Sequence, residues 1–415
     1  MIEIIRTVVK AEVTSHSRLV LCLFLLVSQQ AWGKIESPDL KLFPRPPTVE
    51  RQIKFWEKIF RIYPSYATVI HDLRNPDHII DIIDFKVWAG EKGLNQIPSR
   101  KMKNMIINSY LKRYRLALKR FRRMGKLALK FGPIENRIFN VYKKNKTDVR
   151  SLYKGKIYLR SQNGLADEFI EAAKRAQEYL PFMEKAFEKE GVPQHVTRLA
   201  FVESMFNLKA RSKVGASGIW QFMPSTAKRY LIINRFVDER NSPFKASKAA
   251  AKLLLKNYKR LKSWPLAITA YNHGLAGMRR AVRQTRSRSI DDIISKFRSQ
   301  SFGFASKNFY SEFLAATNVY DLILKKNLLK KVNKKIDVVA IKLNKRLSVA
   351  QMLKKAPILR DSFEKFNNGI RKSAFSRYKF RKLPRKFEIF VPKTIAEKVK
   401  KGLQIRDYKK YAKSK

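Results

Sequence analysis

Apolar residues recur at helical spacing over much of this chain, and lysines and arginines fill many of the positions between them. In segment 101–131, six apolar residues stand three or four positions apart: Ile107, Tyr110, Tyr114, Leu118, Phe121 and Met124. This spacing predicts an amphipathic helix with one face toward a core and a basic face toward solvent. The basic face also favours contact with an anionic polymer or membrane surface.

Helical spacing returns after residue 165 in one segment after another. The expected helices cover 165–189, 193–206, 246–261, 264–272 and 307–326. The chain is therefore expected to be mainly α, with a helical domain over residues 161–330. Residues 34–160 are expected to form a mostly helical accessory region, which begins with a proline-rich lead-in.

Strand-like patterns are shorter. Ile79–Phe85 is an apolar run typical of a β-strand, although its periodicity does not separate it from helix. After residue 335 the order is strand, helix, helix, strand, over Asp337–Leu343, Ser348–Lys355, Ser362–Asn367 and Lys386–Val391. This order predicts a small α+β module over residues 336–393, followed by a lysine-rich basic tail over 394–415.

The N-terminus has the pattern of a secretory signal. Arg6, Lys10 and Arg18 precede the apolar run 19–27, and small residues flank Trp32 at the two positions that a signal peptidase reads. Residues 1–33 are therefore expected to direct export to the periplasm, to the outer membrane or out of the cell. The alternative is a short buried helix. Cys22 is the only cysteine, so cleavage after Gly33 would exclude disulfides and thiolate metal sites from the mature chain.

The formal net charge is +57 over 415 residues. Such an excess predicts attraction to a polyanion, for which nucleic acid, anionic lipid and bacterial cell wall are the candidates. An exported chain has no access to its own genome, so the expected partner is an anionic cell-wall or membrane surface and not nucleic acid.

The most informative residue is Glu203, because it lies in the apolar helical run Leu199–Asn207. Burial of a carboxyl group favours its neutral form, and a neutral carboxylic acid near pH 7 is what general-acid cleavage of a glycosidic bond requires. A glycine-rich turn follows at 214–224, and the sequence Ala270-Tyr271-Asn272-His273-Gly274 comes later. Taken alone, Glu203 would be expected at the solvated edge of its helix.

These three segments together resemble a known family. Glu203-Ser204, the stretch Gly-Ala-Ser-Gly-Ile-Trp-Gln-Phe-Met-Pro-Ser-Thr at 215–226 and Ala270-Tyr271-Asn272 are similar to the lysozyme-like catalytic domain of soluble lytic transglycosylases. Within that family the likeness is to the membrane-bound lytic murein transglycosylase D type. It covers residues 160–325. The strand–helix–helix–strand module resembles a LysM wall-binding module, with an unrelated α+β cap as the alternative.

The resemblance implies cleavage of the β-1,4 bond between N-acetylmuramic acid and N-acetylglucosamine in peptidoglycan, without a metal or other cofactor. Glycosidases usually need two carboxyl groups. No second acid accompanies Glu203 in these motifs, and Asp238-Glu239-Arg240 is typical of a loop that leads into a helix. Glu203 is therefore expected to act alone as acid and base, and to leave a 1,6-anhydromuramic acid end.

Supporting roles follow from the same resemblance. The residues expected to bind substrate are Ser217, Gln221, Tyr271, Asn272 and Tyr310. The structural alternatives are a cap or turn amide for Gln221 and Asn272, and core packing for Tyr271 and Tyr310. Ala276 stands where the family commonly has a second glycine, which puts the loop after Asn272 in question.

Two histidine features invite other roles. His273 is expected to cap its loop or stack on sugar and not to act in catalysis. His71-Asp72 and Asp77-His78 flank the turn signal Asn75-Pro76, so a surface loop is expected there and not a metal site. Two other function classes stay open: a goose-type lysozyme that delivers water to C1, and a non-catalytic wall-binding protein.

Overall fold

The computed structural model describes residues 39–143, 146–155, 157–329, 336–356 and 358–405. The expected signal segment and Cys22 lie outside these residues. The chain divides into two compact units. The first unit is formed by residues 39–171 with Leu261–Leu329, and the second by Ala172–Arg260 with residues 336–405. The division does not follow the expected boundary at residue 160.

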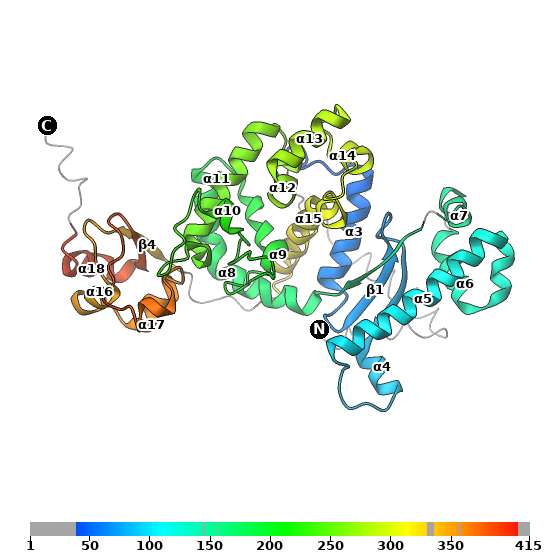
Figure 1. Cartoon of the computed structure of the whole chain (residues 1–415), viewed down its shortest axis with the longest axis horizontal. Helices are drawn as coiled ribbons and strands as arrows, with labels where there is room; N and C mark the ends of the chain where they lie inside the picture. Colours follow the sequence, from blue (N-terminus) through cyan, green and yellow to red (C-terminus); the bar gives the residue numbers. More distant parts are fainter. Residues whose placement is uncertain (1–38, 144–145, 156, 330–335, 357, 406–415) are drawn as a thin grey trace. The chain divides into compact units, whose positions relative to one another are not determined.

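Helices dominate both units, which confirms the mainly α fold (Figure 1). The helices of the first unit are α3 (Pro47–Arg61), α4 (Phe85–Glu91), α5 (Arg100–Met124), η1 (Gly125–Phe131), α6 (Pro133–Tyr142), α7 (Lys146–Tyr153), α12 (Trp264–His273), α13 (Leu275–Thr285), α14 (Ile290–Lys296) and α15 (Phe304–Lys325). The division between the units crosses α8 (Ala166–Lys189).

The accessory region contains a sheet that the periodicity did not predict. Strands β1 (Ala67–Asp72), β2 (Ile79–Asp84) and β3 (Leu159–Asn163) form an antiparallel sheet in the order β2-β1-β3. In its register, Val69 of the central strand pairs with Ile82 on one side and with Gln162 on the other. The apolar run at 79–85 is confirmed as a strand as far as Asp84, after which Phe85 starts α4.

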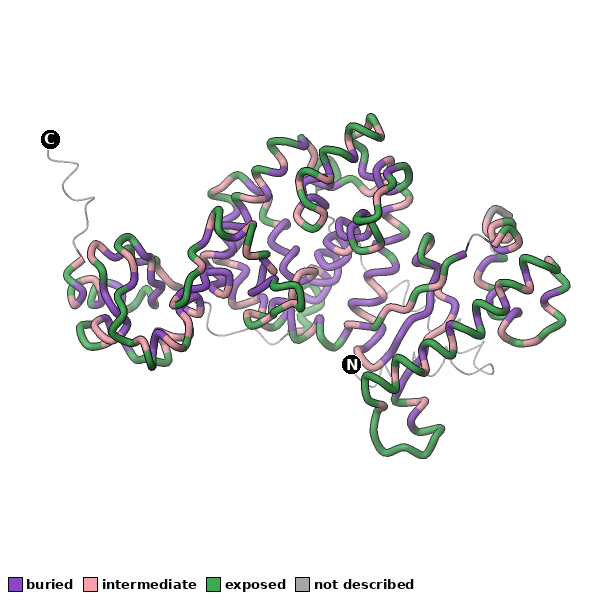
Figure 2. The backbone as a smooth tube through the Cα atoms, in the orientation of Figure 1, coloured by how far each residue is buried: buried purple, intermediate pink, exposed green. Residues whose placement is uncertain are grey.

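The surface loop expected around His71 and Asp72 is wrong. Both residues belong to β1, which is buried along its length (Figure 2). The centroid of the His71 ring lies 4.5 Å from that of the Phe55 ring. Burial lowers the pKa of His71 to about 4, so the imidazole is neutral at pH 7. The Asp72 carboxylate accepts a hydrogen bond of 3.0 Å from the Tyr142 hydroxyl. The turn signal at Asn75-Pro76 was correct, but it marks a hairpin between buried strands.

Helix α5 confirms the amphipathic prediction for 101–131. Its buried residues are Ile107, Leu111, Tyr114, Ala117 and Phe121. The α-helix ends at Gly125, whose φ of 58° lies in the left-handed region, and the remainder to Phe131 is a 3₁₀ helix. The core of this part of the first unit lies between α5, α6 and the sheet.

A seam of polar contacts joins α3 to α15. The indole of Trp56 donates to Asn308 Oδ1 at 3.1 Å, and the Ser311 hydroxyl donates to Gln52 Oε1 at 2.6 Å. Two turns further along α15, Asn318 Nδ2 donates to Glu57 Oε1 at 2.6 Å. The N-terminal helix therefore completes the core around α15, which explains why the compact unit crosses the expected boundary.

The second unit contains η2 (Gln194–Arg198), α9 (Leu199–Ser204), α10 (Pro224–Ala227), η3 (Glu239–Asn241) and α11 (Pro243–Leu261). The expected single helix over 193–206 is thus a 3₁₀ turn followed by a short α-helix. The C-terminal part of the unit is formed by β4 (Val338–Lys342), α16 (Val349–Lys355), α17 (Arg360–Phe366), η4 (Lys372–Ala374), β5 (Glu388–Pro392), η5 (Lys393–Ile395) and α18 (Ala396–Gly402).

The strand–helix–helix–strand order of the C-terminal module agrees with these elements. β4 and β5 pair antiparallel, with Ala340 opposite Phe390. Ser348 caps α16 through a capping box with Gln351. The basic tail was expected to begin at residue 394. The structure instead has α18 at this place, and Val399 and Leu403 are buried in the core of the module.

Glu312 is a carboxyl group in the middle of α15, next to the buried residues Ser311 and Phe313. Burial raises its pKa to about 8, although the charge of Arg160 opposes the shift. Between pH 4.5, the ordinary pKa of the group, and pH 8, the unfolded chain ionises while the folded chain keeps the proton. The protonated form of Glu312 therefore contributes its full stabilisation of the folded state below pH 4.5. This contribution decreases as the pH rises and is lost near pH 8.

We expect Glu312→Gln to remove this pH dependence. The melting temperature of the variant should rise relative to that of the wild type as the pH increases from 5 to 8, by about 2–4 °C for each kcal/mol. Thermal unfolding followed by circular dichroism at both pH values measures the difference. Glu397→Gln, whose side chain is 81% exposed, is the control. An equal offset of the Glu312→Gln variant at pH 5 and pH 8 would contradict the expectation.

Candidate active site

Glu203 lies in the last turn of the short helix α9, where its side chain is half-buried. The chain reverses directly after it, because Met205 and Phe206 both have left-handed φ angles, of 50° and 53°. Such angles are uncommon for residues other than glycine and concentrate at functional sites. Phe206 is held by a ring contact of 4.5 Å with Phe201, and the Met205 carbonyl accepts from Arg175 at 2.8 Å.

A side-chain hydrogen bond ties α9 to the glycine-rich turn. The hydroxyl of Ser204, the residue after Glu203, donates to the carbonyl oxygen of Ile219 at 2.8 Å. Two of the three motifs that the sequence singled out are therefore fixed to one another within the second unit.

Gln221 lies at the end of this turn, with a left-handed φ of 44°. Its side-chain amide donates to the carbonyl oxygens of Gly218, at 2.8 Å, and of Ala210, at 3.2 Å. These contacts use both N–H donors and fix the side chain, which leaves Oε1 as its acceptor. The Gln221 side chain therefore has the structural role of a turn amide, and its Oε1 atom is at the same time held in one orientation.

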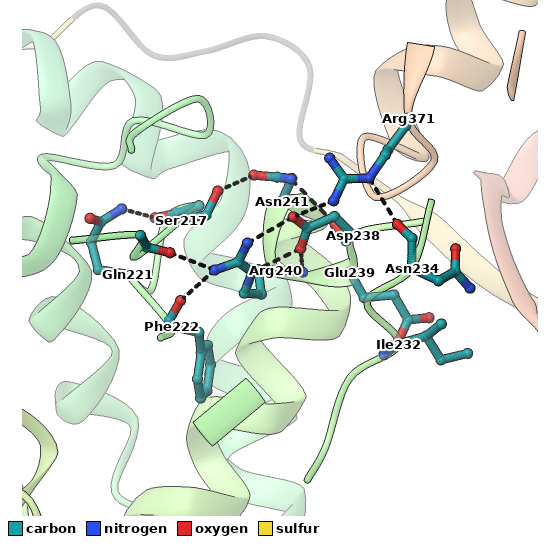
Figure 3. Close-up of polar contacts among 12 residues, drawn as sticks. Ser217, Gln221, Phe222, Ile232, Asn234, Asp238, Glu239, Arg240, Asn241 and Arg371 are labelled. Atoms are coloured by element: carbon teal, nitrogen blue, oxygen red, sulfur yellow. Dashed lines mark hydrogen bonds and ion pairs between the residues drawn. The ribbon is translucent and has the colours of Figure 1, made fainter. Parts of the chain in front are cut away.

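Ser217 is 3% exposed, and its hydroxyl donates to Asn241 Oδ1 at 2.8 Å (Figure 3). Its backbone N–H donates to the carbonyl oxygen of Phe222 at 3.3 Å. Both contacts connect parts of the turn region to each other, so the geometry supports a structural role for Ser217. Its contact with substrate stays a prediction.

Arg240 organises the turn, a role that the sequence motifs did not indicate. Its guanidinium forms a two-pronged contact with the Asp238 carboxylate, with both N–O distances at 2.9 Å (Figure 3). Its third nitrogen donates to the carbonyl oxygens of Gly215, at 2.7 Å, and of Phe222, at 3.1 Å. The charge pair thus holds both ends of the turn. The available signal was an acid and an arginine two residues apart directly before a helix.

The Asp238 carboxylate has a second cationic partner, Arg371 of the C-terminal module, at 3.3 Å. Burial alone would raise the pKa of Asp238, but the hydrogen bonds and charge of Arg240, with the charge of Arg371, hold it below its usual range. Asp238 accepts from the Arg240 backbone N–H at the start of η3, which leads into α11. The prediction of a loop that leads into a helix is confirmed.

Tyr271 and Asn272 lie at the end of α12 in the first unit, whereas Glu203, Ser217 and Gln221 belong to the second. Tyr271 is half-buried. Asn272 is exposed, and its Oδ1 accepts from the Ser306 hydroxyl at 2.8 Å, which ties α12 to α15. This contact leaves the side-chain amide nitrogen of Asn272 as a donor.

The surroundings of His273 favour a structural role for this residue. Its ring lies 5.0 Å from the Phe302 ring, and burial with the charge of Arg280 lowers its pKa below the usual value. Ala276, the departure from the family pattern, lies in the first turn of α13. Alanine favours a helix more than glycine does, so this departure affects a helix and not the conformation of a loop.

Tyr310 is 1% exposed, and its hydroxyl donates to the carbonyl oxygen of Pro44 at 3.0 Å. Burial raises its pKa far above the usual value. This placement favours the alternative of core packing, in which Tyr310 holds the segment before α3 against α15. Its contact with substrate stays an untested prediction.

Comparison with known families identifies the segment around these motifs. Residues 181–294 match the family model described as transglycosylase SLT domain. This segment is similar to transglycosylase SLT domains, and the rest of the chain lies outside the match. The match contains Glu203, Ser217, Gln221, Tyr271 and Asn272, and it ends before Tyr310.

Three relatives are similar to part of this chain. Membrane-bound lytic murein transglycosylase D from Escherichia coli strains K12 and O6:H1 is 31% identical over 133 residues, which is 32% of this chain. The chain spans only 28% of the length of those relatives. A putative tributyltin chloride resistance protein from Alteromonas sp. (strain M-1) is 31% identical over 117 residues, 28% of this chain and 56% of that protein.

Two solved structures are also similar. An inactive mutant of lytic transglycosylase Slt from Pseudomonas aeruginosa has a TM-score of 0.27 and 18% identity, over 52% of this chain and 30% of that one. The 70 kDa soluble lytic transglycosylase from Escherichia coli has a TM-score of 0.30 and 16% identity, over 53% and 39% of the two chains.

The described part of the chain contains no group of three or more His, Cys, Asp or Glu side chains placed to hold a metal ion. None of the helices described there has the length and apolar character needed to cross a membrane.

We expect Gly218→Ala to disrupt the SLT turn, because a Cβ atom there would lie 1.9 Å from the Arg240 carbonyl oxygen. The expected loss is about 3 kcal/mol or more of unfolding free energy, measured by denaturant titration. Gly215→Ala is the matched control, since its φ is also positive but no atom lies within 4 Å of the new methyl group. It should cost only about 1–2 kcal/mol. Equal losses in the two variants would refute the contact with Arg240 as the cause.

Proposed function

We propose that this protein is a peptidoglycan lytic transglycosylase that uses Glu203 as its single general acid and base. The hydrogen bond between Ser204 and Ile219 supports this proposal most directly. It fixes α9, the helix that carries Glu203, to the turn that carries Gln221. Both segments lie within the matched SLT domain. The names of the E. coli relatives favour murein as the substrate.

The proposed reaction needs one carboxyl group in two protonation states. Glu203 donates its proton to the glycosidic oxygen as the bond to C1 of N-acetylmuramic acid breaks. The resulting carboxylate then takes the proton of the C6 hydroxyl of the same sugar, and the C6 oxygen forms the new bond to C1. The acid is thereby regenerated and no water is consumed. The products are a 1,6-anhydro end and a free hydroxyl on the leaving sugar.

The environment of Asp238 argues against a second carboxyl group in catalysis. Both of its oxygens are engaged by Arg240, and Arg371 adds a second positive charge. Its neighbour Glu239 accepts from the Ile232 backbone N–H at 2.8 Å. Glu239 is also paired with Lys245, at 3.5 Å. Both acids are thus held by cationic partners in the structure of the turn, which favours the intramolecular route over the lysozyme-like one.

The positive charge and the C-terminal module favour action at the cell wall after export. The antiparallel pairing of β4 and β5 around two helices agrees with the LysM-like order, so we assign wall glycan as the ligand of this module. The stem-peptide carboxylates of the wall provide the negative charge that a +57 chain attracts.

We expect Glu203→Gln to abolish the release of anhydromuropeptides from purified sacculi, with a fall of about 10²–10⁴-fold or more. Mass spectrometry of the digests measures the products. Glu188→Gln, an exposed acid of α8, is the control and should keep full activity. Reducing-end products would indicate a goose-type hydrolase, and bound but uncut sacculi would indicate a wall-binding protein.

Wall binding should weaken with salt. The Debye length falls from about 10 Å at 0.1 M to about 3 Å at 1 M, so contacts between exposed charges are screened. We expect the fraction of Glu203→Gln protein that sediments with sacculi to fall steadily over this range. Sedimentation with chitin, a neutral glycan, is the comparison and should change less. A response to salt that is equally flat for both polymers would contradict the proposed role of the charge.

A further inference from the structure

A cavity of about 270 Å³ opens in the first unit between β2, α4, α5 and the start of α6. None of the residues that line it belongs to the matched SLT segment, and none was singled out by the motifs. Figure 1 shows α4 and α5 beside the sheet that carries β1, in the blue and cyan part of the chain.

Aromatic side chains form part of the cavity wall. Trp88 of α4 and Tyr110 of α5 are half-buried and border the cavity. Tyr114 also lines it and is buried as part of the neighbouring core. Pockets for small ligands combine such aromatic walls with a few polar groups that fix orientation. A sugar ring suits this wall, because its C–H face stacks on an aromatic ring.

The carboxylates in the cavity are held in place by other protein groups. Asp81 accepts from the Tyr114 hydroxyl at 2.6 Å and from Arg137. Asp84 Oδ1 accepts from the backbone N–H groups of Lys86, at 2.8 Å, and Val87, at 3.1 Å, at the start of α4. An ionised carboxylate has about four acceptor sites, so both groups keep capacity for a ligand hydroxyl or amide. Acceptors fixed in advance lose little entropy on binding.

The charge of the cavity differs from that of the whole chain. Three carboxylates, of Asp81, Asp84 and Glu91, stand against the two guanidinium groups of Arg113 and Arg137. The chain as a whole carries +57. A polyanion would gain little from this nearly balanced site, whereas an uncharged polar ligand fits it.

We propose that this cavity is a saccharide-binding site that holds one amino-sugar ring of a glycan strand, stacked on Trp88 and Tyr110. The choice of an amino sugar rests on the proposed function, whereas saccharide binding rests on the cavity. The site would hold a strand at a place whose residues lie outside the SLT domain.

Fluorine NMR of the full chain tests this site directly. The Glu203→Gln protein is labelled with 5-fluorotryptophan, and Trp88→Phe identifies the Trp88 signal among those of the five tryptophans. Titration with chitohexaose, a neutral amino-sugar chain, should shift the Trp88 signal and saturate. Tyr110→Ala should raise the dissociation constant at this signal at least about tenfold, the equivalent of 1.4 kcal/mol. Phe131→Ala, an exposed aromatic residue that does not line the cavity, should leave it within about twofold.

Two results would overturn the proposal. One is a Trp88 signal that chitohexaose does not move, and the other is a signal that shifts with a free stem peptide and not with the sugar. An unchanged dissociation constant in folded Tyr110→Ala protein would overturn the stacking. The sacculus digestion tests the proposed function separately. That function fails if the wild-type protein releases no anhydro products from sacculi. A Trp88 response without such products would leave a glycan-binding protein.

Discussion

The buried guanidinium of Arg240 is the constraint on which the candidate site depends. A buried charge is stable only when it is paired and hydrogen-bonded, and Arg240 meets this with one carboxylate and two backbone carbonyls. The same residue limits Gly218, because its carbonyl oxygen occupies the space of a side chain there. The ion pair of Arg240 with Asp238 therefore fixes the conformation of the glycine-rich turn. Ser204 then joins that turn to the helix of Glu203.

The C-terminal module takes part in this arrangement. Arg371 contacts Asp238, the Asp238 backbone N–H donates to the Gly369 carbonyl at 2.7 Å, and Val237 lies in the core of the module. The loop that carries Asp238 therefore contacts both the glycine-rich turn and the C-terminal module. The C-terminal module is therefore not a detachable appendage, because its core packing also positions the acid that holds Arg240. The α3–α15 seam has the same consequence in the first unit, where the N-terminal helix completes the core.

The success of prediction depended on the range of the interactions. Helices such as α5 and α12 and the strands of the C-terminal module follow from local periodicity. Strands β1 and β3 do not, since the polar run Leu159–Asn163 pairs with a partner about 90 residues away in the sequence. His71 is buried by this pairing together with long-range ring contacts such as that with Phe304. Glu203 was visible as an acid in an apolar run, and Glu312 carries the same signal in α15. Tyr271 and Tyr310 look alike in the sequence, yet burial separates them.

The distribution of charge separates two tasks that the proposed enzyme would perform at a cell wall. Long-range attraction from a large positive charge raises the local concentration of enzyme at an anionic polymer, but it is screened within about 8 Å at physiological salt and does not orient a sugar. Orientation needs short contacts from fixed groups, for which the proposed sites offer Oε1 of Gln221 and the carboxylates of Asp81 and Asp84. Those carboxylates are held by uncharged or locally paired donors. A chain this basic can keep specific acceptor sites only where local contacts neutralise its own excess charge.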